Sequence, residues 1–389
     1  MELRRLMVSL CLAAAVTTPA AAQRIRLPAS LAELERRAAS DSNDAAAHYN
    51  VALAYWNEKR WDDAEKSLRL AVSIDPRFAH GYLALSRLPY ARRTALWEEV
   101  NTGRVRDEDR AAVDESDRLY KRAYLIDPLV DMKIEGAVTP ARSVYWDLFD
   151  HELYDVLYQG FDDLRQGKYP DAYERIDRLV RLFDSERETP AFVWWYRAVS
   201  AAHVEKYDVA RADLRRLLDR GERRERSDSL IQIPLRTNEY RYVLAYVTQK
   251  AGELNPAIDL YLEALGQDIG LYMAHVQLAN MYEGARMWPQ ATKSRRDAIA
   301  TNPDDATLQL DLGATLAKAG EWQEARQALA AAAEANPRDT RAFYFLGIVQ
   351  QQIGQKAEAR ASFERFVATA PSRYKTQIDN AKQRLAELR

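Results

Sequence analysis

The chain has 389 residues, of which 47% are hydrophobic and 29% are charged, and its formal net charge is −2. This near balance argues against nucleic acid as a partner, because binding a phosphate backbone demands a basic face. The only cysteine is Cys11, so the rest of the chain can form neither a disulfide nor a thiol nucleophile. No stretch of 18 apolar residues follows the N-terminus, and we expect no membrane-spanning segment in the mature chain.

The first 22 residues are typical of a cleaved secretory signal. Arg4 and Arg5 precede an apolar run from Leu6 to Val16, and three alanines end at Ala22, just before Gln23. The run is too short to cross a bilayer, and small residues at this place favour cleavage after Ala22. Together with an Ala-rich and Arg-rich composition, the signal predicts a periplasmic or secreted bacterial protein.

The rest of the chain divides into helical segments by their apolar spacing and their proline and glycine positions. We expect, in chain order, a capping helix over 29–44, helical units over 45–128 with an insertion near 90–110, a non-repeat helical insertion over 129–152, degenerate units and a polar loop over 153–237, four regular units over 238–373, and a second capping helix over 374–389. Terminal caps have a physical reason, because a stack of repeats would otherwise leave an apolar end face bare.

A period of 34 residues governs the C-terminal half. It relates four alanines and three prolines: Ala257, Ala291, Ala325 and Ala359; Pro303, Pro337 and Pro371. Small side chains at fixed places allow two antiparallel helices to approach closely, while a proline cannot continue the helix before it. The period therefore predicts a series of stacked helical pairs.

One unit shows the full pattern, which runs from Ala306 through Leu312, Gly313, Ala325, Leu329 and Ala332 to Pro337. These positions resemble those of the tetratricopeptide repeat family. The resemblance covers most of residues 45–373, strongly at both ends and weakly between, and Arg241, Arg295 and Gln309 depart from it. It implies an all-α, right-handed superhelical solenoid of about eight helix-turn-helix units with insertions. It also implies a non-enzymatic scaffold for protein–protein interaction, whose partner is a protein or peptide.

The resemblance further implies that the first helix of each pair lines a concave groove. The residues at its groove positions are rich in aromatic rings and amides, which suit the capture of a peptide or helix: Tyr49, Asn50, Trp56, Phe192, Trp195, Tyr196, Tyr242, Tyr246, Met273, Gln277, Asn280, Asp311, Tyr344 and Phe345. The alternative is that many of these rings pack against adjacent units or against the middle insertion.

Other features give little support to chemistry. His151 with Glu152 and Asp155 superficially resembles a zinc-protease helix, but the second histidine is missing, so we expect no metal and no cofactor. A divergent hydrolase near His151 is one alternative, and an assembly subunit that binds partners through its insertions is another. The aromatic segment 143–149 is more typical of core than of a cofactor site. The sequence leaves the oligomeric state open.

Overall fold

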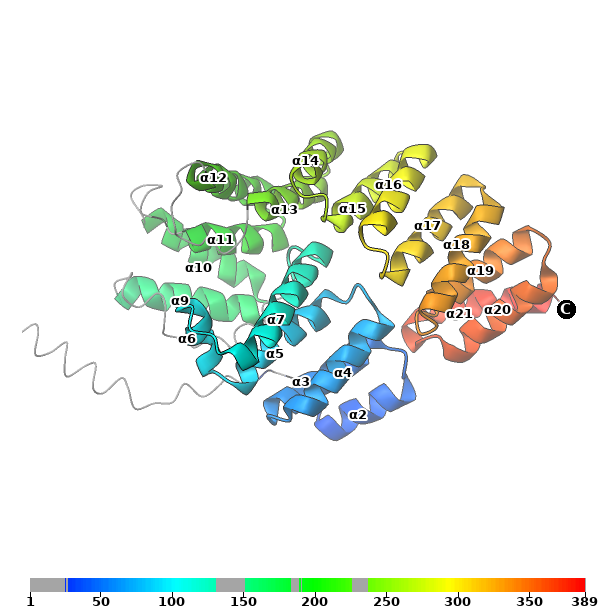
Figure 1. Ribbon diagram of the computed structural model, residues 1–389, viewed down its shortest axis with the longest axis horizontal. Helices are drawn as coiled ribbons and strands as arrows, with labels where there is room; N and C mark the ends of the chain where they lie inside the picture. Colours follow the sequence, from blue (N-terminus) through cyan, green and yellow to red (C-terminus); the bar gives the residue numbers. More distant parts are fainter. Residues whose placement is uncertain are drawn as a thin grey trace, which may run out of the picture.

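The structure is a computed structural model in which Ile25 and residues 27–130, 151–182, 189, 191–225 and 237–388 are described. All regular elements in this part are helices, and sixteen of them form eight antiparallel pairs (Figure 1). The pairs are α3 (Ala45–Asn57) with α4 (Trp61–Ile74), α5 (Ala79–Arg92) with α7 (Asp107–Ile126), α9 (His151–Arg165) with α10 (Tyr169–Leu182), α11 (Ala191–His203) with α12 (Tyr207–Glu225), α13 (Thr237–Lys250) with α14 (Leu254–Gln267), α15 (Tyr272–Gly284) with α16 (Trp288–Thr301), α17 (Ala306–Ala319) with α18 (Trp322–Ala335), and α19 (Arg341–Gln352) with α20 (Lys356–Thr369).

Shorter elements flank and interrupt the pairs. Helix α2 (Leu31–Ser40) precedes the first pair, and α21 (Lys375–Glu387) follows the last one after the 3-10 turn η1 (Ser372–Tyr374). Helix α6 (Ala95–Asn101) separates α5 from α7, within the stretch where an insertion was expected. The signal segment 1–22, the aromatic segment 143–149 and most of the expected insertion over 129–152 lie outside the described residues.

The small residues of the repeat act as the 34-residue period predicts. Ala257, Ala291, Ala325 and Ala359 are fully buried. A Cβ atom added to Gly313 would lie 2.5 Å from Cγ of Leu329, so α17 and α18 meet at this point with no space for a side chain. The helical pairs are therefore held by close backbone approach as well as by apolar burial.

Local signals in the sequence set the helix ends. The Asp305 carboxylate accepts a hydrogen bond of 3.0 Å from the N–H of Thr307 and caps the start of α17. At the other end of α17, Gly320 adopts a φ of 86°, a left-handed conformation that glycine takes without strain. None of the described helices is both long and apolar enough to cross a membrane.

The stacked pairs curve until the two ends of the repeat array meet (Figure 1). The Asn43 side chain donates a hydrogen bond of 3.0 Å to the carbonyl of Thr369, and the N–H and hydroxyl of Ser372 each donate one of 2.9 Å to Asp41. The α2–α3 connection is thereby joined to the end of α20 and to η1, more than three hundred residues later in the chain. The solenoid is closed on itself.

Candidate protein-binding surface

The inner face of the C-terminal half is filled by the chain itself. The C-terminal end of α7 and the residues after it lie against α11 and α13. The Tyr242 hydroxyl donates a hydrogen bond of 2.7 Å to the carbonyl of Leu125, and the ring is only 1% exposed. Burial raises the pKa of this hydroxyl well above its ordinary value. Trp195, also buried, has its ring centroid 6.3 Å from that of Tyr124.

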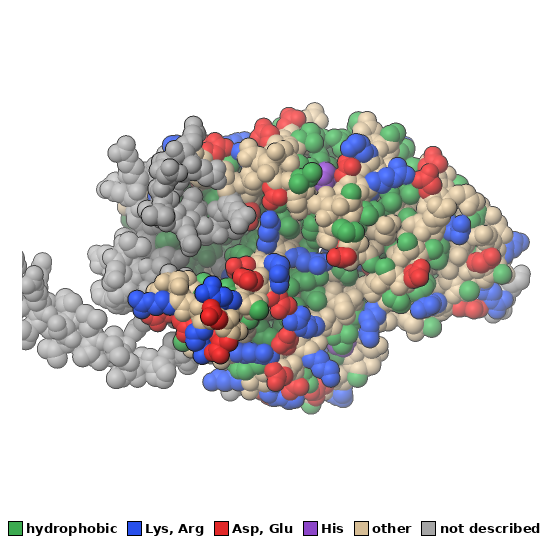
Figure 2. Space-filling model, in the orientation of Figure 1, with side chains coloured by type: hydrophobic (Ala, Val, Ile, Leu, Met, Phe, Trp, Pro, Cys, Tyr) green, Lys and Arg blue, Asp and Glu red, His purple; other side chains and the backbone are tan. Residues whose placement is uncertain are grey.

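Charged pairs continue this internal interface. The N-terminal half contributes cations and the C-terminal half contributes carboxylates at three pairs: Arg77 with Asp311 at 2.5 Å, Lys121 with Asp268 at 3.3 Å, and Arg122 with Asp305 at 3.9 Å. Figure 2 shows basic and acidic side chains facing one another where the two halves meet. Because all three pairs have the same polarity, they attract the two halves toward each other.

Asp305 is the most buried member of these pairs, with its side chain fully covered. Burial raises the pKa of its carboxyl, although Arg77 and Arg122 act in the opposite direction. The Asp305 Oδ2 atom and the Tyr272 hydroxyl make no hydrogen bond within the described part of the chain. The ionised carboxylate is therefore only partly compensated here.

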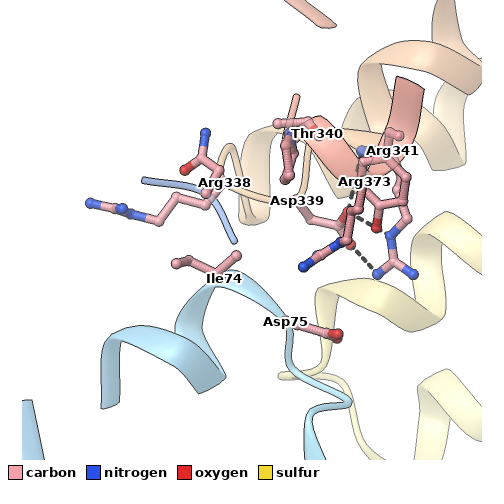
Figure 3. A pocket seen from close by; sticks show the side chains of 10 residues that line it. Ile74, Asp75, Arg338, Asp339, Thr340, Arg341 and Arg373 are labelled. Atoms are coloured by element: carbon pink, nitrogen blue, oxygen red, sulfur yellow. Dashed lines mark hydrogen bonds and ion pairs between the residues drawn. The ribbon is translucent and has the colours of Figure 1, made fainter. Parts of the chain in front are cut away.

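A small pocket lies where α19 and η1 approach the α4–α5 connection (Figure 3). Arg341 donates to both oxygens of Asp339, at 2.7 and 2.6 Å, and Ile74 and Asp75 come from the opposite side. Since Arg341 is already held by a bidentate ion pair, this pocket offers no unpaired cation from that residue to an anionic ligand.

The remaining groove candidates of the central units are tied to their neighbours. Met273 is buried in the core, while Tyr246 is half-buried beneath Lys250. The Gln277 side chain accepts hydrogen bonds from Gln249 at 3.3 Å and from Asn280 at 3.5 Å. Asn280 is exposed and accepts a hydrogen bond of 2.7 Å from Arg295. Of the candidates Tyr246, Met273, Gln277 and Asn280, only Asn280 is exposed.

The outer units place their candidates in separate local clusters. The Tyr344 hydroxyl donates a hydrogen bond of 3.0 Å to Asn380 of the capping helix α21, and Phe345 packs beside the Tyr344 ring. Three further rings have aromatic neighbours within their own or the adjacent pair: Tyr49 with Phe78, Trp56 with Trp61, and Tyr196 with Phe161. Asn50 and Phe192 are half-buried.

The expectation of one open groove lined by these residues therefore needs correction. Trp195, Tyr242 and Met273 are buried core residues, and Tyr344 faces a cap instead of a ligand. The physical reason is the closure of the superhelix, which packs residues 124–129 against α11 and α13. The alternative that the rings pack internally holds for Trp195, Tyr242 and Tyr344.

The histidines of the described part have structural contacts. His203 stacks on Tyr169 with ring centroids 3.7 Å apart, and its Nε2 atom lies 3.0 Å from the carbonyl oxygen of Leu129. His275 is half-buried, and burial lowers its pKa. Within the described ranges no group of three His, Cys, Asp or Glu side chains could hold a metal ion. The side chains of His151 and Asp155 lie outside the described residues.

Sequence reasoning missed an apolar strip on the outer surface. Leu254 and Leu262 of α14, Ile269 just beyond it and Met287 before α16 are exposed, and Ile269 is 79% exposed. The spacing of Leu254, Ile258, Leu262 and Leu265 was the available signal, because positions three or four apart lie on one side of a helix. The strip lies on α14, the second helix of its pair, whereas the predicted groove positions all lie on first helices.

Comparison with known proteins supports the repeat assignment. Residues 45–78 and 310–374 match family models described as tetratricopeptide repeat. None of the curated proteins matches the chain.

Several solved structures are similar at low identity. The C-terminal part of a tetratricopeptide repeat-containing protein from Cytophaga hutchinsonii is 16% identical, with a TM-score of 0.48 over 60% of this chain and 87% of that one. MamA of AMB-1 is 16% identical over 45% of this chain and 89% of its own, with a TM-score of 0.35. The repeat domain of P58(IPK) is 14% identical over 92% of both chains, with a TM-score of 0.27. From the matched repeats and the eight stacked helical pairs we conclude that this chain is a tetratricopeptide repeat protein.

Proposed function

We propose that this protein is a non-enzymatic scaffold of the bacterial cell envelope that binds protein partners on its outer faces. Tetratricopeptide repeats are a protein-binding class of solenoid, which supports the general part of the proposal. The observation that carries the choice of surface is the occupation of the inner face by residues 121–130, seen in the bond between Tyr242 and Leu125. A partner of the closed solenoid must then approach from outside.

Two other modes of binding compete with this one. Capture of a peptide on the inner face would require residues 121–130 to leave, together with the three ion pairs between the halves. Assembly through the insertion would use α6, which is anchored by Arg93 through bonds to Glu99 at 2.7 Å and to Asp109 at 2.7 Å. An experiment has to separate these modes.

A chemical lock tests the outer-face mode directly. Asn336 donates a hydrogen bond of 3.0 Å to the carbonyl of Ser73, across the junction of the two halves. The mature sequence after residue 22 has no cysteine, so Ser73→Cys with Asn336→Cys introduces the only two thiols. A short bismaleimide then joins them. Each single-cysteine variant, treated with the same reagent, serves as the control.

The locked and unlocked proteins are used to capture partners from an envelope extract of the host. We expect the same partner on both, because a closed solenoid is the binding form. A partner retained only by the unlocked protein would replace this mode with binding on the inner face. If the cross-linked protein retains the partner but a variant lacking residues 95–101 loses it, the contact is assigned to α6. The lock is more informative than Trp195→Ala or Tyr242→Ala, since both remove buried side chains.

The envelope location rests on the signal-like segment 1–22 and has its own test. We expect the periplasmic or secreted fraction to contain a chain beginning at Gln23, measured by mass spectrometry of the intact protein. A full-length chain confined to the cytoplasm would overturn the location without affecting the scaffold proposal.

A further inference from the structure

Helix α14 has apolar residues at two repeat positions where the second helices of the other regular units have polar or small residues. The 34-residue period relates two positions, one turn apart, in the second helix of each regular unit. They carry polar or small residues in the other regular units, of which Thr292 is buried and the rest are half-buried or exposed: Glu65 and Arg69 in α4, Thr292 and Arg296 in α16, Arg326 and Ala330 in α18, and Arg360 and Glu364 in α20. In α14 the same two positions are Ile258 and Leu262.

Ion pairs of the other units show what the exposed residues at these positions do. Arg69 lies 2.8 Å from Glu65, Arg360 lies 2.8 Å from Glu364, and Arg296 lies 2.7 Å from Glu324 of the next unit. Such pairs keep the outer surface hydrated and add little to stability. Where they would stand on α14, Leu262 is 51% exposed.

The departure extends along the helix and beyond its end. Leu254 is exposed one turn before Ile258, and Leu265 follows Leu262 on the same side. Ile269 stands where four other units have proline: Pro76, Pro303, Pro337 and Pro371. An apolar strip thus runs from Leu254 to Ile269, about 22 Å at the helical rise of about 1.5 Å per residue.

The charged residues of segment 253–270 are all acidic, and two of them, Glu253 and Asp268, pair with Arg211 and Lys121 of other helices. Residues 253–270 include Glu253, Asp259, Glu263 and Asp268, and no lysine, arginine or histidine. Asp259 and Glu263 lie on the exposed side of α14 beside the strip, and the Glu263 side chain is 63% exposed. Glu263 lies 3.6 Å from Arg241, so a neighbouring cation reaches only one of these two carboxylates within the described contacts.

The packing of α14 leaves its surroundings open. It packs more loosely on α15 than α16 does on α17 or α18 does on α19. A Cβ added to Gly266, on the exposed side of α14, would meet no atom within 4 Å. Met287, at the start of α16 in the next unit, is a further exposed apolar residue. Leu254, Leu262 and Ile269 are the exposed residues of the strip, while Ile258 and Leu265 are half-buried against the core.

We infer that the strip from Leu254 to Ile269 binds an amphipathic helix of another protein, whose apolar ridge is flanked by lysine or arginine. The apolar ridge buries the exposed leucines, and the basic flank pairs with Asp259 and Glu263. This inference rests on the proposed outer-face function and specifies one of its contacts. Charge complementarity selects a basic helix over an acidic one, which the same carboxylates would repel.

The test uses the mature chain and two fluorescent helical peptides of about 18 residues, a length that matches the strip. Both have the same leucine ridge, one with lysine flanks and one with glutamate flanks. Binding is measured by fluorescence anisotropy. Leu262→Arg places a cation in the strip, and Leu182→Arg is its matched control, because Leu182 at the end of α10 is 52% exposed and Leu262 is 51% exposed.

We expect the lysine peptide to bind at least about tenfold more tightly than the glutamate peptide, and Leu262→Arg to weaken it by about tenfold or more. Leu182→Arg is expected to leave the affinity within about twofold. Equal binding of the two peptides, or an equal effect of the two variants, would overturn the inference. So would a dimer of the native chain that Leu262→Arg dissociates, since a second copy would then cover the strip.

These results are distinguishable from the outcome of the capture experiment. If the cross-linked protein retains its partner but the lysine peptide fails to bind, the proposed outer-face function stands. The inferred contact at the strip is then wrong. If the lock loses its partner while the peptide binds at the strip, the inner face serves the cellular partner and the strip remains a separate site. Circular dichroism of both leucine variants checks that each is folded.

Discussion

The Tyr242 hydroxyl on α13 donates a hydrogen bond of 2.7 Å to the carbonyl of Leu125 at the end of α7, 117 residues earlier in the chain. The two residues belong to repeat units that are not neighbours in the stack. Their contact, which is fully buried, connects the N-terminal and C-terminal halves of the solenoid. The inner face is thereby converted from a binding groove into part of the core.

Removal of this hydrogen bond has a measurable cost. Tyr242→Phe leaves the Leu125 carbonyl without its donor and is expected to lower the free energy of unfolding by about 1–2 kcal/mol. Tyr344→Phe, whose hydroxyl reaches half-buried surroundings near Asn380, should cost less. Urea unfolding of the three proteins gives the comparison. Equal losses would contradict a special role for the Tyr242 contact.

Asp305 is expected to cost stability at neutral pH. Burial is the main cause that raises the pKa of the Asp305 carboxyl in the folded protein. A carboxyl with a raised folded pKa stabilises the fold below its unfolded pKa of about 3.9. This stabilisation is lost as the pH rises through the folded pKa. Asp305→Asn keeps a side chain that can cap α17 but carries no charge. We expect it to raise the melting temperature at pH 7 and not near pH 3. A lower melting temperature at pH 7 would show that its ion pairs outweigh burial.

Glu283 should have the opposite pH dependence. Burial opposes its charge, but hydrogen bonds from Lys318, Thr315 and Arg295 outweigh burial and lower its pKa. It therefore stabilises the fold above the unfolded pKa of about 4.3, and this contribution is lost as the pH falls through the lowered folded pKa. Glu283→Gln is expected to cost about 1–3 kcal/mol at pH 7 and to flatten the acid limb of a stability-against-pH curve. An unchanged acid limb would contradict this role.

Two glycine-to-alanine substitutions should have opposite effects on the stability of the fold. A Cβ at Gly347 would lie 2.7 Å from the Phe363 ring, whereas one at Gly266 would meet nothing within 4 Å. Gly347→Ala is therefore expected to destabilise the protein by about 1–3 kcal/mol through overpacking. Gly266→Ala should stabilise α14 by up to about 1 kcal/mol, because alanine favours the helix. Thermal melts of both variants test the pair, and a stabilising Gly347→Ala would refute the close approach of α19 and α20.

Arg77, Lys121 and Arg122 pair with carboxylates of the C-terminal half, whereas Asp44 pairs in the opposite sense with Arg373. Arg77→Glu would place a third carboxylate beside Asp305 and Asp311, and the halves should then separate. We expect a larger radius of gyration by small-angle X-ray scattering, with unchanged helicity by circular dichroism. Arg69→Glu, on the outer face of α4, is the control and should leave the radius unchanged. A compact Arg77→Glu protein would mean that the apolar contacts near Leu125 suffice for closure.

Much of the fold could be predicted from the sequence because the repeat is local. The positions of Gly313, Ala325 and Pro337 fix one helical pair, and the 34-residue period carries this geometry along the C-terminal half. Arg295, which departs from the pattern, is explained by its bonds to Glu283 at 2.8 Å and Asn280 at 2.7 Å. A charge network replaces apolar packing there.

The candidate site could not be predicted in the same way. Whether Tyr242 lies in an open groove depends on the total curvature of the stack, which accumulates from small rotations at each junction. No single repeat contains that information, and the contact of Tyr242 with Leu125 has no counterpart in the period. The outer strip could be predicted from the sequence, because Leu262 is apolar at a repeat position where Arg296 and Glu364 are charged.

The bonds from Asn43 to Thr369 and from Ser372 to Asp41 affect how the molecule unfolds. A linear repeat array loses its terminal units first, because each end has a neighbour on one side only. Here each end is held by the other, and releasing either one means breaking contacts between segments separated by more than three hundred residues. Fraying is thus suppressed at both ends together, and the chain gains cooperativity that its one-dimensional architecture would not otherwise provide.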